Sequence, residues 1–253
     1  MDSKAVWAAA RAQLALDLGC DPALLDSPDN EAVLWQDRKG RRMYCADTPF
    51  LELAVWNGKL IASCRPSLLS WIRENLLPCR AEWLFLPRNF RRLEAGLAPF
   101  GYELGDARHF YLPVLPCAQA VPQGPVCWYE QEALEQFRDA DTWSEALAFN
   151  PFAPDMLAVA ALDKSGSPIA MAGASRDGAH LWQIGIRVLP AYQGQGLGAN
   201  LTALLKDELL RRGIVPLYST AESHIISQHV ALRAGFSPAF GYLYARRMQT
   251  KGT

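Results

Sequence analysis

Apolar residues recur along the chain with two different periods, which predict alternating helices and strands. The clearest helix follows a loop at residues 189–195 and should end at about Arg212, because Gly213 suits the left-handed C-cap position. Its leucines keep the spacing of one helical face: Leu197, Leu201, Leu204, Leu205 and Leu209. Similar patterns around it predict strands at residues 156–162, 168–174, 180–188, 215–219 and 242–246, and helices at 131–140, 142–149 and 224–234.

The first half of the chain carries a strong hairpin signal. Asn57 and Gly58 separate two apolar strand-like runs, and both turn positions of such a hairpin require positive φ. The pattern in this half predicts helices at residues 3–18, 66–77 and 90–100, and strands at 32–35, 42–45, 50–56, 59–64, 81–86 and 108–115.

Proline and glycine gather between the two halves, at Pro113, Pro116, Pro122, Gly124 and Pro125. Such a stretch favours an extended linker. We therefore expect an N-terminal domain at residues 1–116, a linker at 117–126 and a second domain at 127–253. Both halves end in a glycine next to an aromatic residue and then a strand, which indicates a degenerate internal repeat; chance similarity of two α/β segments is the alternative.

Composition excludes several classes of function. With 25 basic and 26 acidic residues the formal net charge is −1, so no excess of positive charge suggests a nucleic acid or a membrane surface as partner. No apolar run reaches the roughly 18–20 residues that span a bilayer, and the N-terminus lacks the pattern of a secretory signal. The six cysteines form no C-x-x-C pair, and the four histidines show no metal-ligand spacing with cysteine. We expect a cytoplasmic protein without a metal site.

The candidate chemistry lies between a strand and the clearest helix, in the run Gln193-Gly-Gln-Gly-Leu-Gly198. The first N–H groups of a helix have no partner inside it, and the helix dipole leaves partial positive charge there. Glycines let a diphosphate approach the backbone closely. The run therefore predicts an anion site. It also satisfies the loose dinucleotide pattern G-x-G-x-x-A, with Glu222 further on, but too little chain follows Ala199 for a dinucleotide-binding sheet.

The same segment resembles motif A of the GNAT acetyltransferase superfamily, Val-x-Pro-x-Tyr-Arg/Gln-x-x-Gly-x-Gly/Ala. The matching residues are Val188, Pro190, Tyr192, Gln193, Gly196 and Gly198. A second signature of the family, which ends in Gly-Phe, is similar to residues 224–236, through Ser227, Ala231, Gly235 and Phe236. The resemblance covers roughly residues 127–248. In the first half, Arg65-Pro66-Ser67 stands where the glycine loop would be expected.

The resemblance implies a binding site for acetyl-CoA. In the family, the strand before the loop bulges and splays from its neighbour, and its backbone pairs with the pantetheine arm. Gly185 fits a bulge or a close backbone approach, with packing as the alternative. His224 and Ser227 match positions beside pantetheine. The implied contacts are Ile186, Arg187 and Val188 for pantetheine and Gln193, Gly194, Gln195, Gly196, Leu197, Gly198 and Ala199 for the pyrophosphate.

The usual acid and base of the family are absent from the matching positions. Many members carry a Glu where this chain has Trp182 and a Tyr where it has Ala231. Trp182 is expected to shape the acceptor pocket or pack in the core. Our candidates for proton transfer are Glu222 and His224, at the end of the strand that follows the long helix, and Tyr242, on the last strand.

Together these observations predict an α/β protein of the GNAT acyl-CoA N-acyltransferase fold. Its mixed, splayed sheet would be flanked by helices and preceded by a degenerate α/β domain of similar pattern. The expected function is acetyl transfer from acetyl-CoA to a primary amine of a small molecule or peptide, by direct attack. A non-catalytic acyl-CoA-binding sensor or partner module is the first alternative, and a nicotinamide or flavin enzyme is the second. A homodimer is one assembly that we consider.

Overall fold

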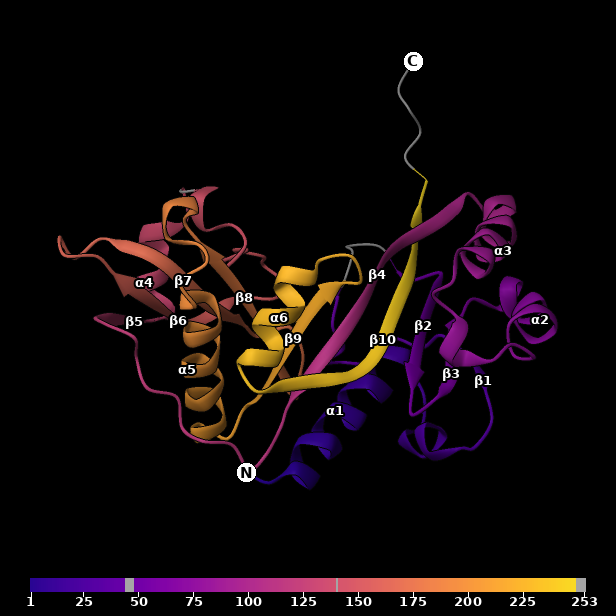
Figure 1. Cartoon of the computed structure of the whole chain (residues 1–253). Coiled ribbons are helices and arrows are strands. Elements are labelled where there is room, and N and C mark those ends of the chain that lie inside the picture. Colours follow the sequence, from indigo (N-terminus) through magenta and orange to yellow (C-terminus); the bar gives the residue numbers. More distant parts are fainter. Residues whose placement is uncertain (44–47, 140, 249–253) are drawn as a thin grey trace, which may run out of the picture. The chain divides into compact units, whose positions relative to one another are not determined.

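The computed structural model describes residues 1–43, 48–139 and 141–248 (Figure 1). The chain divides into two compact units, each built from two separate stretches. Unit 1 consists of Met1–Gln13 and Tyr111–Pro238, and unit 2 of Leu14–Phe110 and Ala239–Thr253. Helix α1 (Ser3–Leu18) and strands β4 (Tyr102–Pro113) and β10 (Phe236–Arg247) each contribute residues to both units. The domain boundaries expected from the linker stay a prediction.

The sheet of unit 1 is mixed. Its neighbouring strands are antiparallel except β8 and β9, which are parallel and are joined by helix α5 (Leu197–Arg211). A helical crossover of this kind is what parallel neighbours require. The strands lie in the order β5 (Val126–Glu130), β6 (Asp155–Leu162), β7 (Pro168–Ser175), β8 (Leu181–Val188) and β9 (Val215–Ala221).

Helices cover both faces of this sheet because its strands alternate their apolar side chains between two cores (Figure 1). Leu157 and Val159 of β6 pack in one core with the leucines of α5 and with α6 (Ile225–Arg233). Ala158 and Ala160 face the other core, which contains α4 (Gln131–Leu134) and the turns that follow it, η4 (Glu135–Phe137) and η5 (Asp141–Trp143). This arrangement confirms the predicted α/β class, with a mixed sheet flanked by helices.

Unit 2 contains the predicted hairpin. Asn57 has φ 50° and Gly58 has φ 77°, and they join two antiparallel strands, the first of which begins one residue later than expected. The strand order is β1 (Glu31–Leu34), β3 (Lys59–Cys64), β2 (Leu51–Trp56), β10 and β4, and one face packs against α2 (Pro66–Asn75) and α3 (Pro87–Leu97). The remaining turns are η1 (Pro22–Asp26), η2 (Ala81–Trp83) and η3 (Ala98–Phe100).

A buried ion pair lies on the other face of the unit 2 sheet. The Arg42 guanidinium contacts the Asp17 carboxylate, with Nε to Oδ2 at 2.6 Å, and lies 4.8 Å from the ring centroid of Phe110. Asp17 also accepts the backbone N–H of Arg42. These contacts hold Arg42 outside any strand, so the strand predicted at 42–45 is wrong at its start. Tyr44 and Cys45 lie outside the described residues.

Several predicted elements have other bounds in the structure, and three predictions give the wrong type of element or a much longer helix than the structure has. The apolar run at 81–86 forms η2 rather than a strand, because only Ala81 and Leu84 of it are buried, three residues apart. In place of the helix predicted at 131–140, the structure has the short helix α4 and the turn η4. In place of the helix predicted at 142–149, it has only the short turn η5. Short apolar runs are ambiguous in this way when neighbouring elements decide which residues become buried.

The proline-rich linker runs along α5 in unit 1. The Ala120 N–H donates to Asp207, the Gln123 N–H donates to Asn200 Oδ1 at 3.1 Å, and Asn200 Nδ2 donates to the Val121 carbonyl. The start of the chain is also fixed in this unit, since the Gln13 side chain is buried and accepts the His180 N–H at 2.9 Å. Unit 1 therefore needs residues from before residue 14 and from the linker.

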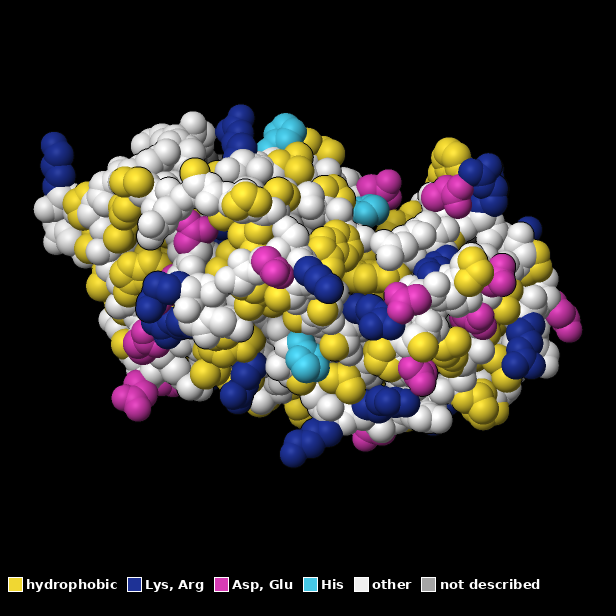
Figure 2. All heavy atoms as spheres, turned by 90° about the horizontal axis from the view of Figure 1, so that it is seen from below, with side chains coloured by type: hydrophobic (Ala, Val, Ile, Leu, Met, Phe, Trp, Pro, Cys, Tyr) yellow, Lys and Arg dark blue, Asp and Glu magenta, His cyan; other side chains and the backbone are white. Residues whose placement is uncertain are grey.

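The surface carries charges of both signs. Figure 2 shows Lys and Arg side chains interspersed with Asp and Glu on the face that it presents. None of the helices in the described part of the chain is both long and apolar enough to cross a membrane. Within residues 1–43, 48–139 and 141–248, His, Cys, Asp and Glu do not gather in any group of three that could hold a metal ion.

Candidate functional site

Strands β8 and β9 separate partway along their length. Their pairing runs from Leu181 opposite Val215 to Ile184 opposite Tyr218, whereas β8 continues to Val188 and β9 to Ala221. Beyond Ile184 the described strands form no further β8–β9 pairs, so one edge of β8 is open. The predicted splay is present. The bulge is not, because β8 keeps a regular register with β7 up to Val188.

Gly185 begins the open edge and serves a close backbone approach. A Cβ there would lie 2.4 Å from the carbonyl oxygen of Glu145. Its partner on β7, Gly173, is equally constrained, since a Cβ would lie 2.3 Å from the carbonyl oxygen of Ala146. The two glycines therefore let residues 145 and 146 lie directly on the sheet beside the opening.

The predicted anion loop lies at the end of β8. Gly194 has φ 76° and Gly196, the N-cap of α5, has φ 84°, a region that glycine enters without strain. The first helical hydrogen bond runs from the Asn200 N–H to the Gly196 carbonyl at 3.0 Å, so the N–H groups just before it have no acceptor within the helix. The Gln193 side chain donates to the Val188 carbonyl at 3.3 Å, which fastens the loop to β8. This geometry suits a bound phosphate.

The start of α5 lies against both β8 and α6. A Cβ at Gly198 would lie 3.5 Å from methyl carbons of Val188 and of Val230, and 3.7 Å from Ile186. The structure thus brings together the residues predicted for the cofactor from β8 and from the loop. Gln123 of the linker joins them, because its side-chain amide lies 3.5 Å from where a Cβ of Gly196 would be. Sequence reasoning missed Gln123, which carries no motif.

Two hydroxyl groups on β9, next to the opening, have no hydrogen-bond partner among the residues that the structure describes. Ser219 Oγ and Thr220 Oγ1 follow the last residue that pairs with β8, and both atoms are buried without a hydrogen bond. Buried polar groups nearly always have a partner, so such atoms are available to a polar ligand. Because these two consecutive side chains point to opposite faces of β9, a pantetheine arm along the open edge of β8 could meet only the hydroxyl on its own face.

A buried tyrosine completes the closed end of the opening. Tyr218 is the last β9 residue that pairs with β8, only 2% of its surface is exposed, and its hydroxyl oxygen lies 2.9 Å from Ser227 Oγ on α6. Burial raises the pKa of Tyr218, although the bond with Ser227 acts in the opposite direction. The sequence pointed to Ser227 only through the resemblance and did not point to Tyr218.

Glu222 and His224 lie together in the exposed turn between β9 and α6, at the strand end where they were predicted. The Glu222 carbonyl accepts a hydrogen bond from the Gln228 side chain at 2.6 Å. His224 is the N-cap residue of α6, but its side chain forms no cap hydrogen bond. Their roles in proton transfer stay predictions.

Three further positions that the sequence singled out are packed among apolar side chains. Trp182 packs against the core beneath α5, as one of its two expected roles requires, and Ala231 is fully buried in that core. Tyr242 belongs to unit 2, where it is 1% exposed and its ring meets Phe110 edge-on at a centroid distance of 6.2 Å. The role of Tyr242 as an acid stays a prediction.

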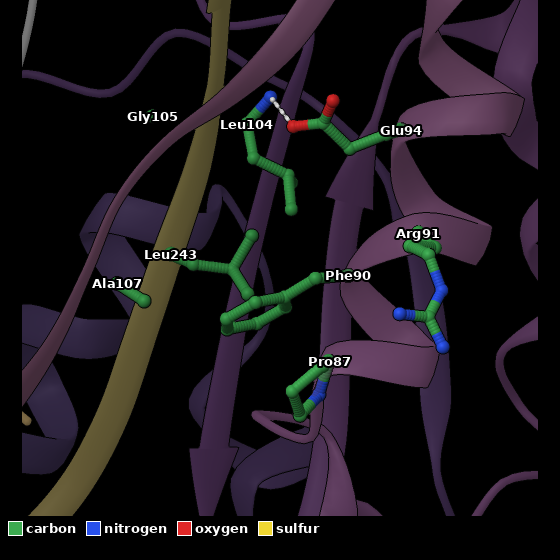
Figure 3. Close-up of a pocket in the computed structure, with 8 residues that line it drawn as sticks. All are labelled: Pro87, Phe90, Arg91, Glu94, Leu104, Gly105, Ala107 and Leu243. Carbon is green, nitrogen blue, oxygen red and sulfur yellow. Dashed lines mark hydrogen bonds between the residues drawn. The ribbon is translucent and has the colours of Figure 1, made fainter.

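Unit 2 holds a separate hollow between α3, β4 and β10 (Figure 3). It has a volume of about 750 Å³. Figure 3 shows apolar side chains of Phe90, Leu104 and Leu243 turned toward one another, while the Glu94 carboxylate accepts the Leu104 N–H at 3.3 Å. The lining includes the first residue of α3, Pro87, which has no backbone N–H, and it contains no glycine-rich loop, so it offers a diphosphate no comparable site.

Comparison with known proteins agrees with the geometry of unit 1. The profile of the Acetyltransferase (GNAT) family matches residues 125–236. A solved GCN5-related N-acetyltransferase from Sphaerobacter thermophilus aligns over 96% of this chain and 92% of its own, with 15% identity and a TM-score of 0.50. This likeness concerns the fold.

Two other solved structures are similar at lower scores. A GCN5-related N-acetyltransferase-like protein from Streptococcus suis 89/1591 has 15% identity and a TM-score of 0.48 over 94% of this chain and 99% of its own. An acetyltransferase from the GNAT family of Colwellia psychrerythraea has 15% identity and a TM-score of 0.41, and 62% of each chain is covered. No curated protein sequence matches this one. Residues 125–236 are therefore identified as a domain of the acetyltransferase (GNAT) family.

Proposed function

We propose that the protein is an N-acetyltransferase that moves an acetyl group from acetyl-CoA to a primary amine of a small molecule or peptide. The observation that carries this proposal is the opening between β8 and β9, because its open strand edge leads directly to the glycine-rich start of α5. An extended pantetheine arm can pair with the edge while the diphosphate meets the helix N-terminus. The contacts named for acetyl-CoA at residues 186–188, 193–199, 224 and 227 form part of this proposal.

The proposed chemistry is direct attack of the amine on the thioester carbonyl. Backbone N–H groups on the open edge of β8, from Gly185 onward, hold the oxygen that becomes negative in the transition state. Binding both substrates in one opening supplies proximity and orientation, which account for a large part of the rate in such reactions. Water, Glu222 or His224 takes the proton from the amine.

The test uses the full-length protein, acetyl-CoA and a panel of primary amines: tyramine, lysine, spermidine and glucosamine. We expect release of free CoA that depends on one of the amines, with an acetylated amine identified by mass spectrometry. A reaction without amine serves as the control, because it measures the CoA released by hydrolysis and by acetylation of the protein's own thiols, together with the signal from those thiols. Binding of acetyl-CoA without amine-dependent release of CoA would contradict the proposed activity.

A second candidate is a non-catalytic acyl-CoA-binding module. It is favoured by Trp182 and Ala231, which are packed in the core at the two positions where relatives carry their base and acid. Such a protein would bind acetyl-CoA and would release no free CoA in the assay above.

The degenerate domain at residues 1–116, the cytoplasmic location and a homodimer remain part of the proposal.

A further inference from the structure

We propose that Tyr218, held in place by Ser227, donates a proton to the sulfur atom that leaves acetyl-CoA. The inference rests on the proposed function and adds a catalytic residue to the same site. It starts from the hydroxyl pair at the closed end of the opening, in which Ser227 belongs to the second signature whereas Tyr218 belongs to neither motif.

The reaction requires a proton at the leaving sulfur. As the amine nitrogen bonds to the carbonyl carbon, the C–S bond breaks and the sulfur takes the electron pair. Protonation of that sulfur gives the neutral thiol, and a well-placed donor typically contributes about 10²–10⁴-fold to the rate. The nitrogen loses one proton to water or a base, and the tyrosinate regains one from solvent through Ser227. No oxidant or other co-reactant is needed.

Tyr218 lies where this donor is required. It is the last β9 residue paired with β8, opposite Ile184, and the open edge begins at the next β8 residue, Gly185. A substrate arm that enters between the strands can go no further than this pair. The thioester at the end of such an arm therefore stops beside Tyr218.

Ser227 fixes the direction of the phenol. The two hydroxyl oxygens are 2.9 Å apart, and Ser227 is half-buried whereas the Tyr218 side chain is almost completely buried. The bond joins β9 to α6, so it holds the hydroxyl at the boundary between the core and the opening. Ala231, one turn further along α6, contributes only a methyl group to the same core and carries no proton to donate.

The surroundings keep the phenol protonated before the reaction. Burial raises the pKa of Tyr218, and the Glu145 carboxylate raises it further, while the bond to Ser227 lowers it. Glu145 pairs with Arg187 of β8 at 2.9 Å, so this carboxylate is itself placed at the opening. A phenol with a raised pKa keeps its proton at the pH values of ordinary assays, so it can donate that proton during the reaction.

The experiment compares the wild type with Tyr218→Phe, using acetyl-CoA and acetyl-seleno-CoA as donors and an amine from the panel that the wild type acetylates. A selenol is much more acidic than a thiol, so it leaves without help from an acid. With acetyl-CoA we expect kcat to fall about 10²-fold and KM to change less than about 3-fold. With the selenoester we expect the loss to shrink to less than about 10-fold, which a merely structural defect would not produce.

Two variants complete the test. Ser227→Ala should show the same dependence on the donor with a smaller loss, about 10-fold, because it removes only the orienting bond. Tyr111→Phe is the matched control: its ring meets that of Tyr218 edge-on at 6.4 Å, and loss of its hydroxyl should leave kcat unchanged. Equal losses with both donors, or full activity of Tyr218→Phe and Ser227→Ala, would overturn the inference and leave the proposed function standing. A wild type that acetylates no amine would overturn both.

Discussion

The backbone of Glu145 passes so close to Gly185 that no side chain fits between them. A Cβ at residue 185 would lie 2.4 Å from the Glu145 carbonyl oxygen, a distance that only movement of one backbone relieves. Because Gly185 is also where β8 leaves β9, any such movement changes the opening itself.

We therefore expect Gly185→Ala to lower the free energy of unfolding by about 2–4 kcal/mol, because two backbone segments must separate. Urea unfolding followed by circular dichroism measures this. Gly198→Ala is the control: its Cβ would meet neighbours at an ordinary 3.5 Å and lies in a helix, where alanine is favoured by up to about 1 kcal/mol. Equal effects of the two substitutions would contradict the close approach.

Gly196→Asp should abolish stabilisation by acetyl-CoA, because it places a carboxylate at the N-terminus where the diphosphate is proposed to bind. At a concentration of about 100 Kd, the ligand should raise the wild-type Tm by about 5–10 °C and the variant Tm hardly at all. Gly166→Asp has the same φ of 84° and open surroundings in the β6–β7 turn, so it carries the same strain. It should keep the full shift; a full shift in Gly196→Asp as well would exclude the loop from the cofactor site.

Glu222→Gln and His224→Ala should each lower kcat/KM by less than about 10²-fold, because water can take the proton after attack. Both side chains are exposed in the turn after β9, where neither is held against the opening by a side-chain hydrogen bond that the structure describes. Steady-state kinetics over a range of pH measure this, and the rate should rise as more of the amine becomes unprotonated. A loss of about 10³-fold in one variant, with unchanged affinity for acetyl-CoA, would identify that residue as the base.

The stability of unit 2 should fall as pH rises, through Glu52. Burial raises the pKa of this carboxyl from 4.5 to about 7, against the opposing effect of Arg41, whose Nη2 lies 2.8 Å away. A raised pKa in the folded state means that the contribution of Glu52 is complete below pH 4.5 and is lost as pH approaches about 7. The loss amounts to about 3 kcal/mol.

Glu52→Gln, which stays neutral, should remove this dependence. Unfolding free energies of both proteins at pH 4.5 and 8 give the measurement, and the variant reports the pH dependence of every other group. Between pH 4.5 and 8, the free energy of unfolding should fall by about 3 kcal/mol more in the wild type than in the variant. Parallel curves would show that Glu52 is as easily ionised in the folded protein as in the unfolded chain.

The parts of the site that follow from local chemistry could be predicted. Glycines at 194 and 196 have the positive φ that a tight loop before a helix requires, and the turn at Asn57 and Gly58 forms for the same reason. The start of α5 follows from this loop together with the spacing of its leucines. Each of these features depends on a few neighbouring residues, so the sequence contains the information.

The parts that depend on distant residues could not be predicted. Where β8 stops pairing with β9 depends on packing around the sheet, and the bond between Tyr218 and Ser227 joins two elements across a turn. Residues 142–149 have a helical pattern, yet the chain there follows the groove that Gly173 and Gly185 leave on the sheet. In each case tertiary contact decides among local structures of similar energy.

The division of α1, β4 and β10 between the two units has a consequence for biosynthesis. Unit 2 lacks residues from Ala239 onward until the last strand has left the ribosome, and unit 1 combines the first thirteen residues with Tyr111–Pro238. Unit 2 therefore cannot finish folding until all of unit 1 has been translated, although vectorial synthesis normally lets an N-terminal domain fold first. The early apolar segments of unit 2 must therefore stay incompletely packed until translation is nearly complete, and a cut at the proline-rich linker would divide both units.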